Sequence, residues 1–334
     1  YLMIWHNKAC IRPITRRSLT HSLAFASLSL SSFIPGMATA QEQEIRIIVS
    51  LPAGGGVDAM ARYLGQQLGA ELRRPVVVEN KPGASGTIAA KTVMNAPAGS
   101  LSLLAGGNQE ITIAPHLLND SNYKPLEALV PLMQIGIVPS VLVAKKDGGL
   151  NLGSLLQELK KSNELSVGIP GRGTPMHIAL EDVAMESGGQ FLAVPYKGAP
   201  DVLTGVLSSS TRYGAVGYPA AKSQLDGGNL TAIAVLANQR SKLLPNVPAI
   251  AEKTALKAEL PQVWYGIFAS KKSTDEDISK VSAALEHLLK QAEVRTRLQE
   301  MGIQVTALNT PTFAKALGAE SDYYRNALVR YKVQ

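Results

Sequence analysis

The stretch that decides the fold is Ile45-Arg46-Ile47-Ile48-Val49-Ser50-Leu51-Pro52-Ala53-Gly54-Gly55-Gly56-Val57-Asp58, an apolar run that ends in three glycines. A β-branched run of this length, bounded by proline and glycine, predicts a buried strand. From Met60 onward, apolar residues recur at Leu64, Leu68 and Leu72, a four-residue spacing that places them on one face of a helix. The glycines therefore lie on a strand-to-helix turn.

Such a turn is suited to holding an anion. The first backbone N–H groups of a helix have no partner inside the helix and lie at the positive end of its dipole. Glycine lets a ligand approach this backbone closely. The alternative is that the glycines only make a tight connection while Asp58 caps the helix. The turn by itself leaves both interpretations open.

The first 40 residues have the composition of a bacterial secretory signal. Their only charges are the positive charges of Lys8, Arg12, Arg16 and Arg17. An apolar stretch over 19–34 and the sequence Ala38-Thr39-Ala40 follow, which predicts cleavage before Gln41. The apolar part is too short and too interrupted to span a membrane. Residues 15–19 loosely resemble a twin-arginine signal, and an ordinary Sec signal is the alternative.

The composition of the remaining chain excludes several classes of protein. Removing the predicted signal from the 33 Lys and Arg leaves 29, against 26 Asp and Glu, so the net charge is +3. This mildly basic balance argues against a nucleic-acid binder. The one cysteine, Cys10, lies in the signal and outside a lipobox position, so we expect neither disulfide nor lipid anchor. The 294 residues left of 334 suffice for two ordinary domains.

Short apolar runs alternate with helical patterns along this chain, which predicts an α/β architecture with parallel sheets. Strands are predicted at 45–49, 75–79, 101–105, 138–144, 165–169, 191–196, 213–217, 230–236 and 264–269. Helices are predicted between these strands, and two long helices, from Thr274 and from near Thr310, close the chain.

The two late helices indicate how the chain divides into domains. The first set of strands has too few helices to cover both faces of its sheet, so the late helices must return to it. We therefore expect the chain to cross into a second domain near 140–146 and to return near 264–270. The expected domains are 41–143 plus 265–334, and 144–264. Two crossing strands then form a hinge, with the Gly-rich loops of both domains facing one cleft.

Signatures of enzymes are mostly absent from the sequence. The Gly54–Gly56 turn lacks the spacing of a dinucleotide fingerprint, and Gly83–Gly86 is not a nucleophile elbow. After the signal, the histidines are His116, His177 and His287, which lack the spacing of a zinc site. We expect neither enzyme activity nor a metal or other cofactor.

A second Gly-rich turn, Gly171-Arg172-Gly173-Thr174, follows the strand at 165–169 and precedes another helix. Thr174 before Pro175 has the pattern of a helix N-cap. Arg172 is suited to bidentate pairing with a carboxylate, or is a solvated loop charge. His177 either contacts a ligand or bonds a neighbouring loop. Tyr218, after a later strand, either hangs over the cleft or has its hydroxyl bonded within the protein.

An ordered set of motifs identifies a family that the chain resembles. The motifs are Pro52-x-Gly54-Gly55-Gly56-x-Asp58, Val77-Val78-Glu79-Asn80-Lys81-Pro82-Gly83-Ala84-x-Gly86, Pro170-Gly171-x-Gly173-Thr174-x-x-His177, Val194-Pro195-Tyr196-Lys197-Gly198, Leu244-Pro245-x-Val247-Pro248, Trp264-Tyr265-Gly266 and Glu293-Val294-Arg295-x-Arg297-Leu298. This set resembles the Bug/TctC family, the extracytoplasmic substrate-binding receptors of tripartite tricarboxylate transporters. The resemblance covers essentially the whole chain after the signal.

The resemblance implies an α/β, two-domain periplasmic-binding-protein-like fold of type II (Venus-flytrap), with two crossing strands as hinge. It implies a monomeric periplasmic receptor without a cofactor or nucleic-acid partner. The receptor would capture a small carboxylate in the interdomain cleft and deliver it to the membrane permease subunits of a tripartite tricarboxylate transporter. A receptor that presents its liganded form to a sensor protein, without transport, is the alternative.

The resemblance also implies the site residues, because family members grip a ligand carboxylate largely through loop backbone groups and partly through ordered water. The first-domain contacts would be Ala53, Gly54, Gly55, Gly56, Asp58, Gly106, Gly107 and Asn108. The second-domain contacts would be Gly171, Arg172, Gly173, Thr174, His177 and Tyr218. Arg172, Glu110 and Tyr218 depart from the family pattern, which leaves the identity of the ligand open.

Overall fold

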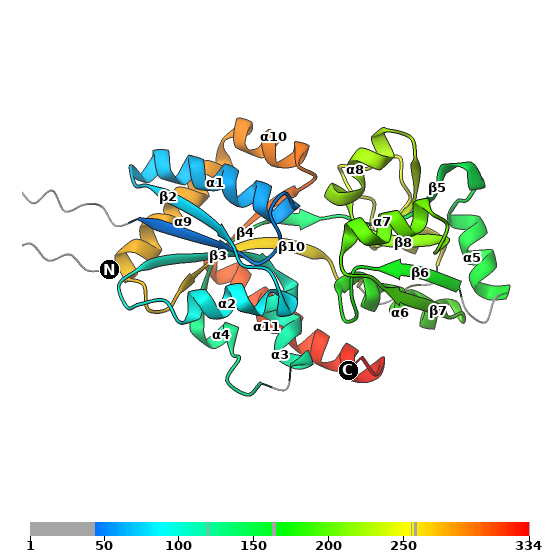
Figure 1. Ribbon diagram of the computed structural model, residues 1–334, viewed down its shortest axis with the longest axis horizontal. Helices are drawn as coiled ribbons and strands as arrows, with labels where there is room; N and C mark the ends of the chain where they lie inside the picture. Colours follow the sequence, from blue (N-terminus) through cyan, green and yellow to red (C-terminus); the bar gives the residue numbers. More distant parts are fainter. Residues whose placement is uncertain (1–43, 119, 162–164, 255, 257–258, 334) are drawn as a thin grey trace, which may run out of the picture. The chain divides into compact units, whose positions relative to one another are not determined.

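The computed structural model describes residues 44–333, except residues 119, 162–164, 255 and 257–258 (Figure 1). The predicted signal peptide, its cleavage site and Cys10 lie outside the described residues. In the part of the chain that is described, no helix combines the length and the hydrophobicity needed to cross a membrane.

Among the described residues, six strands form one sheet, in the order β11-β4-β10-β3-β1-β2. They are β1 (Ile45–Val49), β2 (Val76–Asn80), β3 (Leu101–Gly107), β4 (Leu129–Val138), β10 (Val263–Ser270) and β11 (Gln304–Asn309). β1 is parallel to β2 and β3, whereas β10 is antiparallel to β3 and β4. Because Val49 pairs with Ala105, the carboxyl ends of β1 and β3 lie side by side.

Helices cover both faces of this six-stranded sheet, with α1 and α10 on one side and α2, α4 and α11 on the other (Figure 1). They are α1 (Gly56–Leu72), α2 (Thr87–Met94), α3 (Ala114–Leu117), α4 (Pro125–Ala128), α9 (Asp275–Lys290), α10 (Ala292–Glu300) and α11 (Thr310–Arg330). The alternation of strand residues explains this arrangement. Ile47 of β1 packs with α1 and α9, while its neighbour Ile48 packs with α2 and α11.

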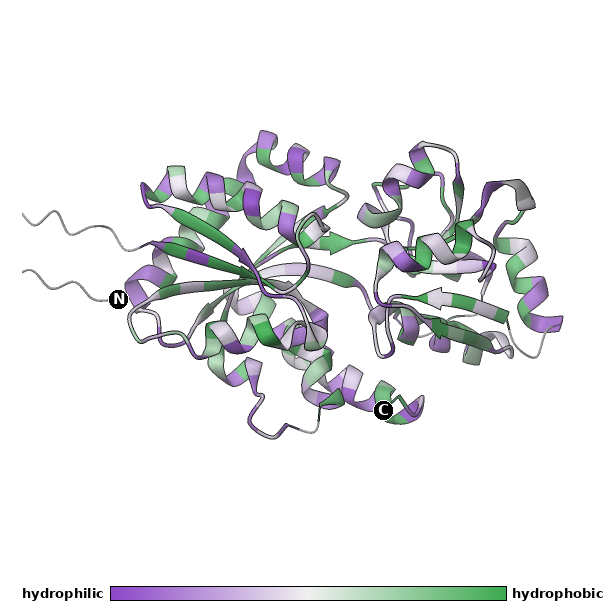
Figure 2. Ribbon diagram, in the orientation of Figure 1, coloured by the Kyte–Doolittle hydropathy of each residue, from purple (hydrophilic) through white to green (hydrophobic). Residues whose placement is uncertain are grey.

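The other sheet has five strands among the described residues, in the order β7-β6-β8-β5-β9. They are β5 (Ser140–Lys145), β6 (Leu165–Ile169), β7 (Phe191–Pro195), β8 (Tyr213–Gly217) and β9 (Leu230–Val235). Its helices are α5 (Leu152–Lys161), α6 (Pro175–Ser187), α7 (Ala199–Leu207) and α8 (Tyr218–Asp226). Leu142 packs with α5 and α6, whereas Val143 packs with α7 and α8. Figure 2 shows the resulting concentration of hydrophobic residues along the strands.

Short helical turns lie between these elements. They are η1 (Ala84–Gly86), the π-helical turn η2 (Gln109–Ile113), η3 (Lys146–Gly148) and η4 (Ile250–Lys253). η1 precedes α2, and η2 follows β3 after one residue, so both turns lie at the edge of the six-stranded sheet where β1 and β3 end.

The chain passes between the two sheets at Pro139. β4 ends at Val138 in the six-stranded sheet, and β5 begins at Ser140 in the five-stranded sheet. Proline lacks the N–H that would continue a strand ladder, which explains the break. The prediction of one strand over 138–144 was therefore wrong at its start.

Two elements near the end of the chain were not predicted. α10 and β11 lie between α9 and α11, where the sequence predicted only two closing helices. α10 buries only Val294 and Leu298, so its apolar pattern is sparse. β11 pairs with β4 at the sheet edge and buries only Val305. Edge strands need few apolar side chains, which removes the signal that identifies a strand.

The long helix α11 contacts the helices of both sheets. Near its start, Phe313 packs edge to face on Trp264 of β10, with ring centroids 5.1 Å apart. Trp264 is buried and lies in the core. Farther along, Tyr324 and Leu328 pack in one cluster with Ile178 of α6. α11 therefore connects the core of the six-stranded sheet to a helix of the five-stranded sheet.

Candidate functional site

The Gly54–Gly56 turn makes a helix start that no side chain caps. Gly55 is the N-cap of α1, and Ala59 donates the first helical bond to its carbonyl at 3.0 Å. The Gly54 N–H is used by Asp58, 2.9 Å away. The N–H groups of Gly56 and Val57 have no hydrogen-bond partner among the described residues. An anion has free donors at this place, at the positive end of a 17-residue helix.

The side chain of Asp58 holds this turn in place. Its carboxylate is buried and accepts from Gly54 N–H, from Arg62 Nε at 3.1 Å and from Asn80 Nδ2 at 2.9 Å. Burial raises the pKa of Asp58, but hydrogen bonds from Arg62, Gly54 and Asn80 outweigh that effect, so the pKa lies below its ordinary value. The carboxylate is thus occupied by protein groups, and its contribution is to shape the turn.

The second predicted loop, Gly106–Asn108, lies beside the first, at the end of β3. Asn108 is buried, and its side-chain Nδ2 donates to Glu320 Oε1 at 2.6 Å and to the Gln262 carbonyl at 3.0 Å. Its Oδ1 accepts from the Trp264 N–H at 3.2 Å. Asn108 therefore ties β3 to β10 and α11, and its amide group is engaged by the protein.

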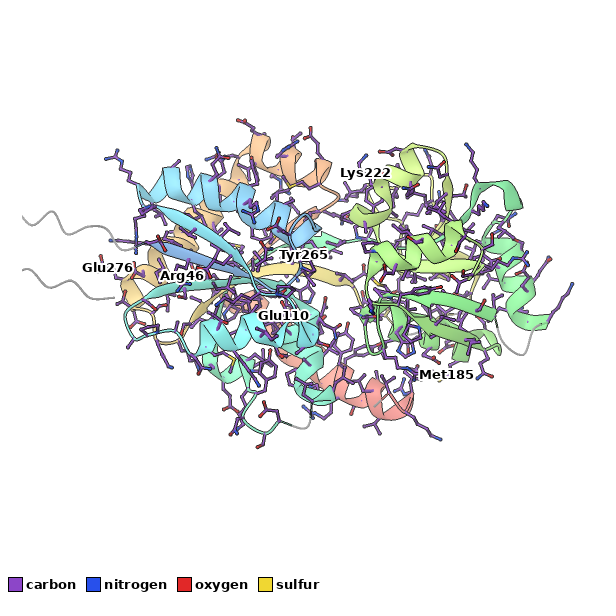
Figure 3. All side chains as sticks on the ribbon, in the orientation of Figure 1. Arg46, Glu110, Met185, Lys222, Tyr265 and Glu276 are labelled. Carbon is purple, nitrogen blue, oxygen red and sulfur yellow. The ribbon has the colours of Figure 1, made fainter. Side chains whose placement is uncertain are left out.

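Tyr265 is a candidate site residue that the sequence analysis missed. It pairs with Gly107 in the sheet, and its hydroxyl lies 3.0 Å from the position that a Cβ on Gly56 would occupy. Burial, together with the nearby charge of Glu110, raises its pKa to about 12, so the hydroxyl keeps its proton and can donate to an anion. Figure 3 labels Tyr265 and Glu110. The two-residue period of a strand places Tyr265 opposite the core residue Trp264, which is the signal that could have found it.

The turn before α6 has the same glycine-rich pattern but is capped from within. Thr174 Oγ1 accepts from the His177 N–H at 3.4 Å and donates to the Gly171 carbonyl at 2.9 Å. The buried His177 ring accepts the Gly173 N–H at Nδ1, 3.0 Å away, so its proton is on Nε2, 3.5 Å from Glu181. His177 thus holds the turn together.

Arg172 is the exposed residue of this second turn. It forms no hydrogen bond or ion pair with any described residue. Its guanidinium is therefore available to an incoming anion.

The structure brings some of the predicted residues together. Pro219, next to Tyr218, has its Cβ 3.6 Å from the Cβ position of Gly56, so the start of α8 adjoins the start of α1. Tyr218 itself is buried, and its ring lies 3.2 Å from the Cβ position of Gly302. Gly173 instead packs on Leu117 of α3, at 2.8 Å from its own Cβ position. The two glycine-rich turns thus have different neighbours.

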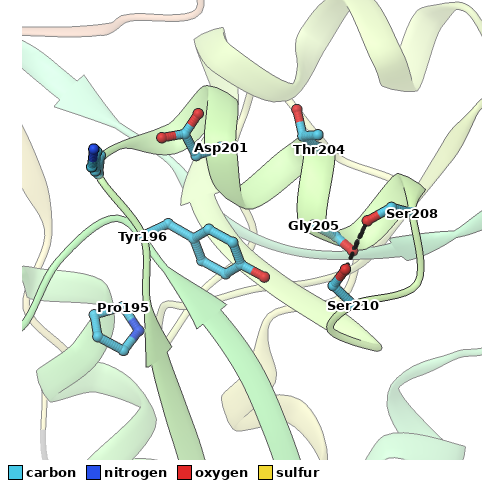
Figure 4. Close-up of a pocket in the computed structure, with 8 residues that line it drawn as sticks. Pro195, Tyr196, Asp201, Thr204, Gly205, Ser208 and Ser210 are labelled. Carbon is cyan, nitrogen blue, oxygen red and sulfur yellow. Dashed lines mark hydrogen bonds between the residues drawn. The ribbon is translucent and has the colours of Figure 1, made fainter.

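Two pockets among the described residues lie away from the predicted contacts. One, of about 630 Å³, is lined by Pro195, Tyr196, Lys197, Asp201, Thr204, Gly205, Ser208 and Ser210. Figure 4 shows its Tyr196 hydroxyl beside Gly205, with Ser208 and Ser210 hydrogen-bonded at 3.0 Å. Another, of about 240 Å³, adjoins Pro139, where the chain crosses between the sheets. Neither of these two pockets contains the donors at the helix starts, which define the candidate site.

The histidines of the described chain bond to separate elements. His116 Nε2 lies 2.9 Å from Ser321 Oγ, and His287 Nδ1 lies 2.9 Å from Glu71 Oε1. Within the described residues, no group of three or more His, Cys, Asp or Glu side chains could hold a metal ion.

Comparison with known proteins identifies the family. A family model described as "Tripartite tricarboxylate transporter family receptor" matches residues 60–329. The protein BugT of Bordetella pertussis is 32% identical over 237 residues, which covers 70% of this chain and 72% of BugT.

Solved structures show the same fold. The periplasmic binding protein BugD matches with a TM-score of 0.75 at 24% identity, over 88% of this chain and 99% of that chain. A protein of R. palustris with adipate matches with a TM-score of 0.79 at 21% identity, over 87% and 98%. MatC from Rhodopseudomonas palustris with bound malate matches with a TM-score of 0.73 at 23% identity, over 86% and 99%. The predicted α/β fold of a periplasmic binding protein is thereby confirmed.

The family model covers most of the chain, which confirms the resemblance to the Bug/TctC family. The protein therefore belongs to the receptors of the tripartite tricarboxylate transporter family, which are solute-binding proteins and not enzymes.

Proposed function

We propose that the protein is a periplasmic receptor that captures a small carboxylate and delivers it to the membrane permease subunits of a tripartite tricarboxylate transporter. Family membership supports the receptor role. The observation that carries the carboxylate is the start of α1, where the N–H groups of Gly56 and Val57 lack partners among the described residues beside the Tyr265 hydroxyl.

One ligand carboxylate would accept hydrogen bonds from Gly56 and Val57 and from Tyr265. Hydrogen bonds to an ionised acceptor are roughly twice as strong as neutral ones, and the helix dipole adds to them. Gly56 keeps the approach open, because a side chain there would meet the Tyr265 hydroxyl. The Gly106–Asn108 backbone would contribute through ordered water.

A second polar group of the ligand would be held across the cleft. Arg172 is the proposed partner, because it is exposed and has no partner among the described residues. Its planar guanidinium matches the two oxygens of a carboxylate. Two of the solved structures with this fold contain a dicarboxylate: MatC contains malate, and the other R. palustris protein contains adipate. Dicarboxylates are therefore the first candidates for the ligand.

We propose the two expected domains, 41–143 plus 265–334 and 144–264, with the first boundary moved to Pro139 and the second moved to the start of β10, so that each strand stays within its own sheet. The crossing from β4 to β5 at Pro139 and the return through β10 support a hinge at these strands. A ligand that contacts both domains would favour the closed state by its differential affinity for that state. Residues 1–40 would direct export to the periplasm, and the mature receptor would be a monomer.

Thermal unfolding of the mature protein, residues 41–334, tests this proposal. A ligand that binds only the folded state raises the midpoint, by about 5 °C at a hundredfold excess over Kd. Malate, adipate and aromatic carboxylates are the probes, and the neutral diamide of each acid is the control. We expect a carboxylate to raise the midpoint and its diamide not to do so. Equal midpoints with and without every carboxylate would contradict the carboxylate assignment.

A further inference from the structure

Glu110 is a buried carboxyl group at the edge of the candidate site. It lies on η2, directly after the Gly106–Asn108 loop, and is 2% exposed. Its Oε1 accepts from the Gly107 N–H at 2.8 Å, and the Ser50 hydroxyl is a further hydrogen-bond partner. Ser50 is the residue that follows β1 and leads into the glycine turn of α1. Glu110 therefore lies where β1 and β3 end.

Two glycines make room for this carboxyl in its position. A Cβ on Gly106 would collide with Glu110 Oε1, and a Cβ on Gly86 would lie 2.8 Å from Oε2. The glycines that border the site thus make space for an acid. The partners that hold it are neutral donors, and no cation forms an ion pair with it among the described residues.

The titratable groups that face Glu110 come from several elements. The Tyr123 hydroxyl donates to the Glu110 backbone carbonyl at 2.6 Å. Lys91 of α2 lies over the ring of Tyr123 and forms an ion pair with Asp120. Besides burial, the charge of Glu110 contributes to the raised pKa of Tyr265 of β10. Glu320 of α11 accepts hydrogen bonds from Thr112 of η2 and from Asn108, which precedes η2. β1, β3 and η1 contribute only neutral groups here, namely Ser50, Gly107 and Gly86.

We propose that Glu110 makes solute binding proton-linked: an anion held at the start of α1 drives the carboxyl of Glu110 to take up a proton. This inference rests on the proposed function. The buried, ionised carboxylate repels an anion bound at the neighbouring edge of the sheet, while the protonated acid does not. Binding therefore favours the neutral form, and protonation favours binding by the same factor.

The direction of the pH dependence follows from this coupling. Burial raises the pKa of Glu110 to about 7, so the Glu110 carboxyl is partly ionised at neutral pH when no ligand is bound. The bound anion raises the pKa further, which means that the complex holds more protons than the free protein. Affinity falls as the pH rises through neutrality, by about tenfold for each pKa unit that the ligand adds. Asp58 keeps its charge in this range, because its pKa is lowered, and Tyr265 keeps its proton.

Calorimetric titration of the mature wild type with malate or adipate measures the proton directly. The observed enthalpy at about pH 7 is compared in two buffers of different ionisation enthalpy, which reports the protons bound per ligand. We expect uptake of a substantial fraction of one proton and weaker binding at about pH 8 than at about pH 6. This wild-type measurement does not depend on the folding of any variant.

Two variants assign the proton to a residue. Glu110→Gln stays neutral at every pH and keeps an oxygen for the Gly107 N–H, so it should abolish the uptake and bind as the wild type does at low pH. Glu320→Gln is the matched control, because burial raises the pKa of Glu320 to about 7 as well. It should retain the uptake.

The possible results separate this inference from the proposed function. Binding without proton uptake overturns the role of Glu110 and leaves the receptor function intact. Uptake that persists in Glu110→Gln, or that only Glu320→Gln removes, overturns the assignment to Glu110. No heat with any carboxylate, together with no thermal shift, refutes the proposed function itself.

Discussion

The starts of α1 and α6 share a glycine-rich pattern and differ in what their backbone donors do. At α1, Gly55 caps the helix without a side chain, and the N–H groups of Gly56 and Val57 lack partners among the described residues. At α6, Thr174 caps the helix and the His177 ring accepts the Gly173 N–H. At the first start no side chain accepts an N–H of the helix cap, whereas at the second the side chains of Thr174 and His177 each accept one backbone N–H.

This difference assigns different tasks to the two turns. An uncapped helix start can bind an anion through its backbone N–H groups. Such binding depends on the charge and position of the carboxylate and hardly on the rest of the ligand. A capped start has fewer backbone donors left to offer, and its exposed side chain is Arg172. We therefore expect affinity to depend mainly on α1 and discrimination between ligands to depend mainly on the α6 turn.

The largest expected effect is at Gly56. Gly56→Val places a side chain against the Tyr265 hydroxyl and Pro219, and it should weaken dicarboxylate binding about 100-fold, since two charge-assisted bonds are lost. Calorimetric titration measures the affinity, and urea unfolding checks that the protein folds. Gly318→Val on α11 is the control, because the Cβ position there faces open space. Unaltered affinity in Gly56→Val would place the anion elsewhere.

At α6, His177→Ala should act on stability. It removes the acceptor of the Gly173 N–H and leaves space in a buried place, so the free energy of unfolding should fall by about 2 kcal/mol. Affinity, measured where the variant is folded, should change by less than about threefold. The exposed His287→Ala, which loses only a surface contact with Glu71, is the control. A loss of affinity with normal stability would instead make His177 a ligand contact.

Arg172 tests whether the capped turn discriminates between ligands. Arg172→Ala should weaken the binding of a dicarboxylate about tenfold and that of the matching monocarboxylate far less. The free energy of unfolding should not change. Arg172→Lys keeps the charge but loses the planar fork, so an intermediate result is expected. Equal weakening of both ligands would count against Arg172 as the clamp for a second carboxylate.

The smallest effect concerns the acid that shapes the open turn. The folded-state pKa of Asp58 is lowered, so its contribution to stability is present above its ordinary value of 3.8 and is lost as the pH falls through the lowered value. Asp58→Asn should lower the free energy of unfolding by about 1 kcal/mol at neutral pH. The variant should also lose less stability than the wild type as the pH falls below 3.8. Urea unfolding as a function of pH measures both. Asp201→Asn, at an exposed position, is the control substitution.

The elements that were predictable are those whose side chains are buried on both sides or along one stripe. Ile47 and Ile48 face opposite cores, so consecutive residues of β1 are apolar from Ile47 to Val49, and Leu64 and Leu68 form the buried stripe of α1. β11 contributes only Val305 to a core, and such an element leaves no periodic signal. The stretches on both sides of Pro139 are mostly apolar, so the sequence pattern predicts one strand where the structure has two.

The glycine and helix patterns predicted the strand-to-helix turn before α1, but they did not show which polar groups nearby are already bonded to protein atoms. Asp58 and Asn108 have the chemistry of ligand contacts, yet in the structure their side chains bond protein atoms. Tyr265 and Glu110 reach the site because β10 and η2 lie beside the ends of β1 and β3. Sheet order, which brings these segments together, cannot be deduced from local periodicity.

Near the end of α11, Tyr323 donates to Asp182 of α6 at 2.7 Å, and Tyr331 bonds the other oxygen of the same carboxylate. Any motion that separates the two proposed domains has to bend this helix or break these bonds. The ratio of open to closed receptor would then depend on two phenols that touch no ligand, and apparent affinity scales with the fraction of competent protein. Replacing either tyrosine by phenylalanine offers a way to adjust the working concentration range of a biosensor without altering its selectivity.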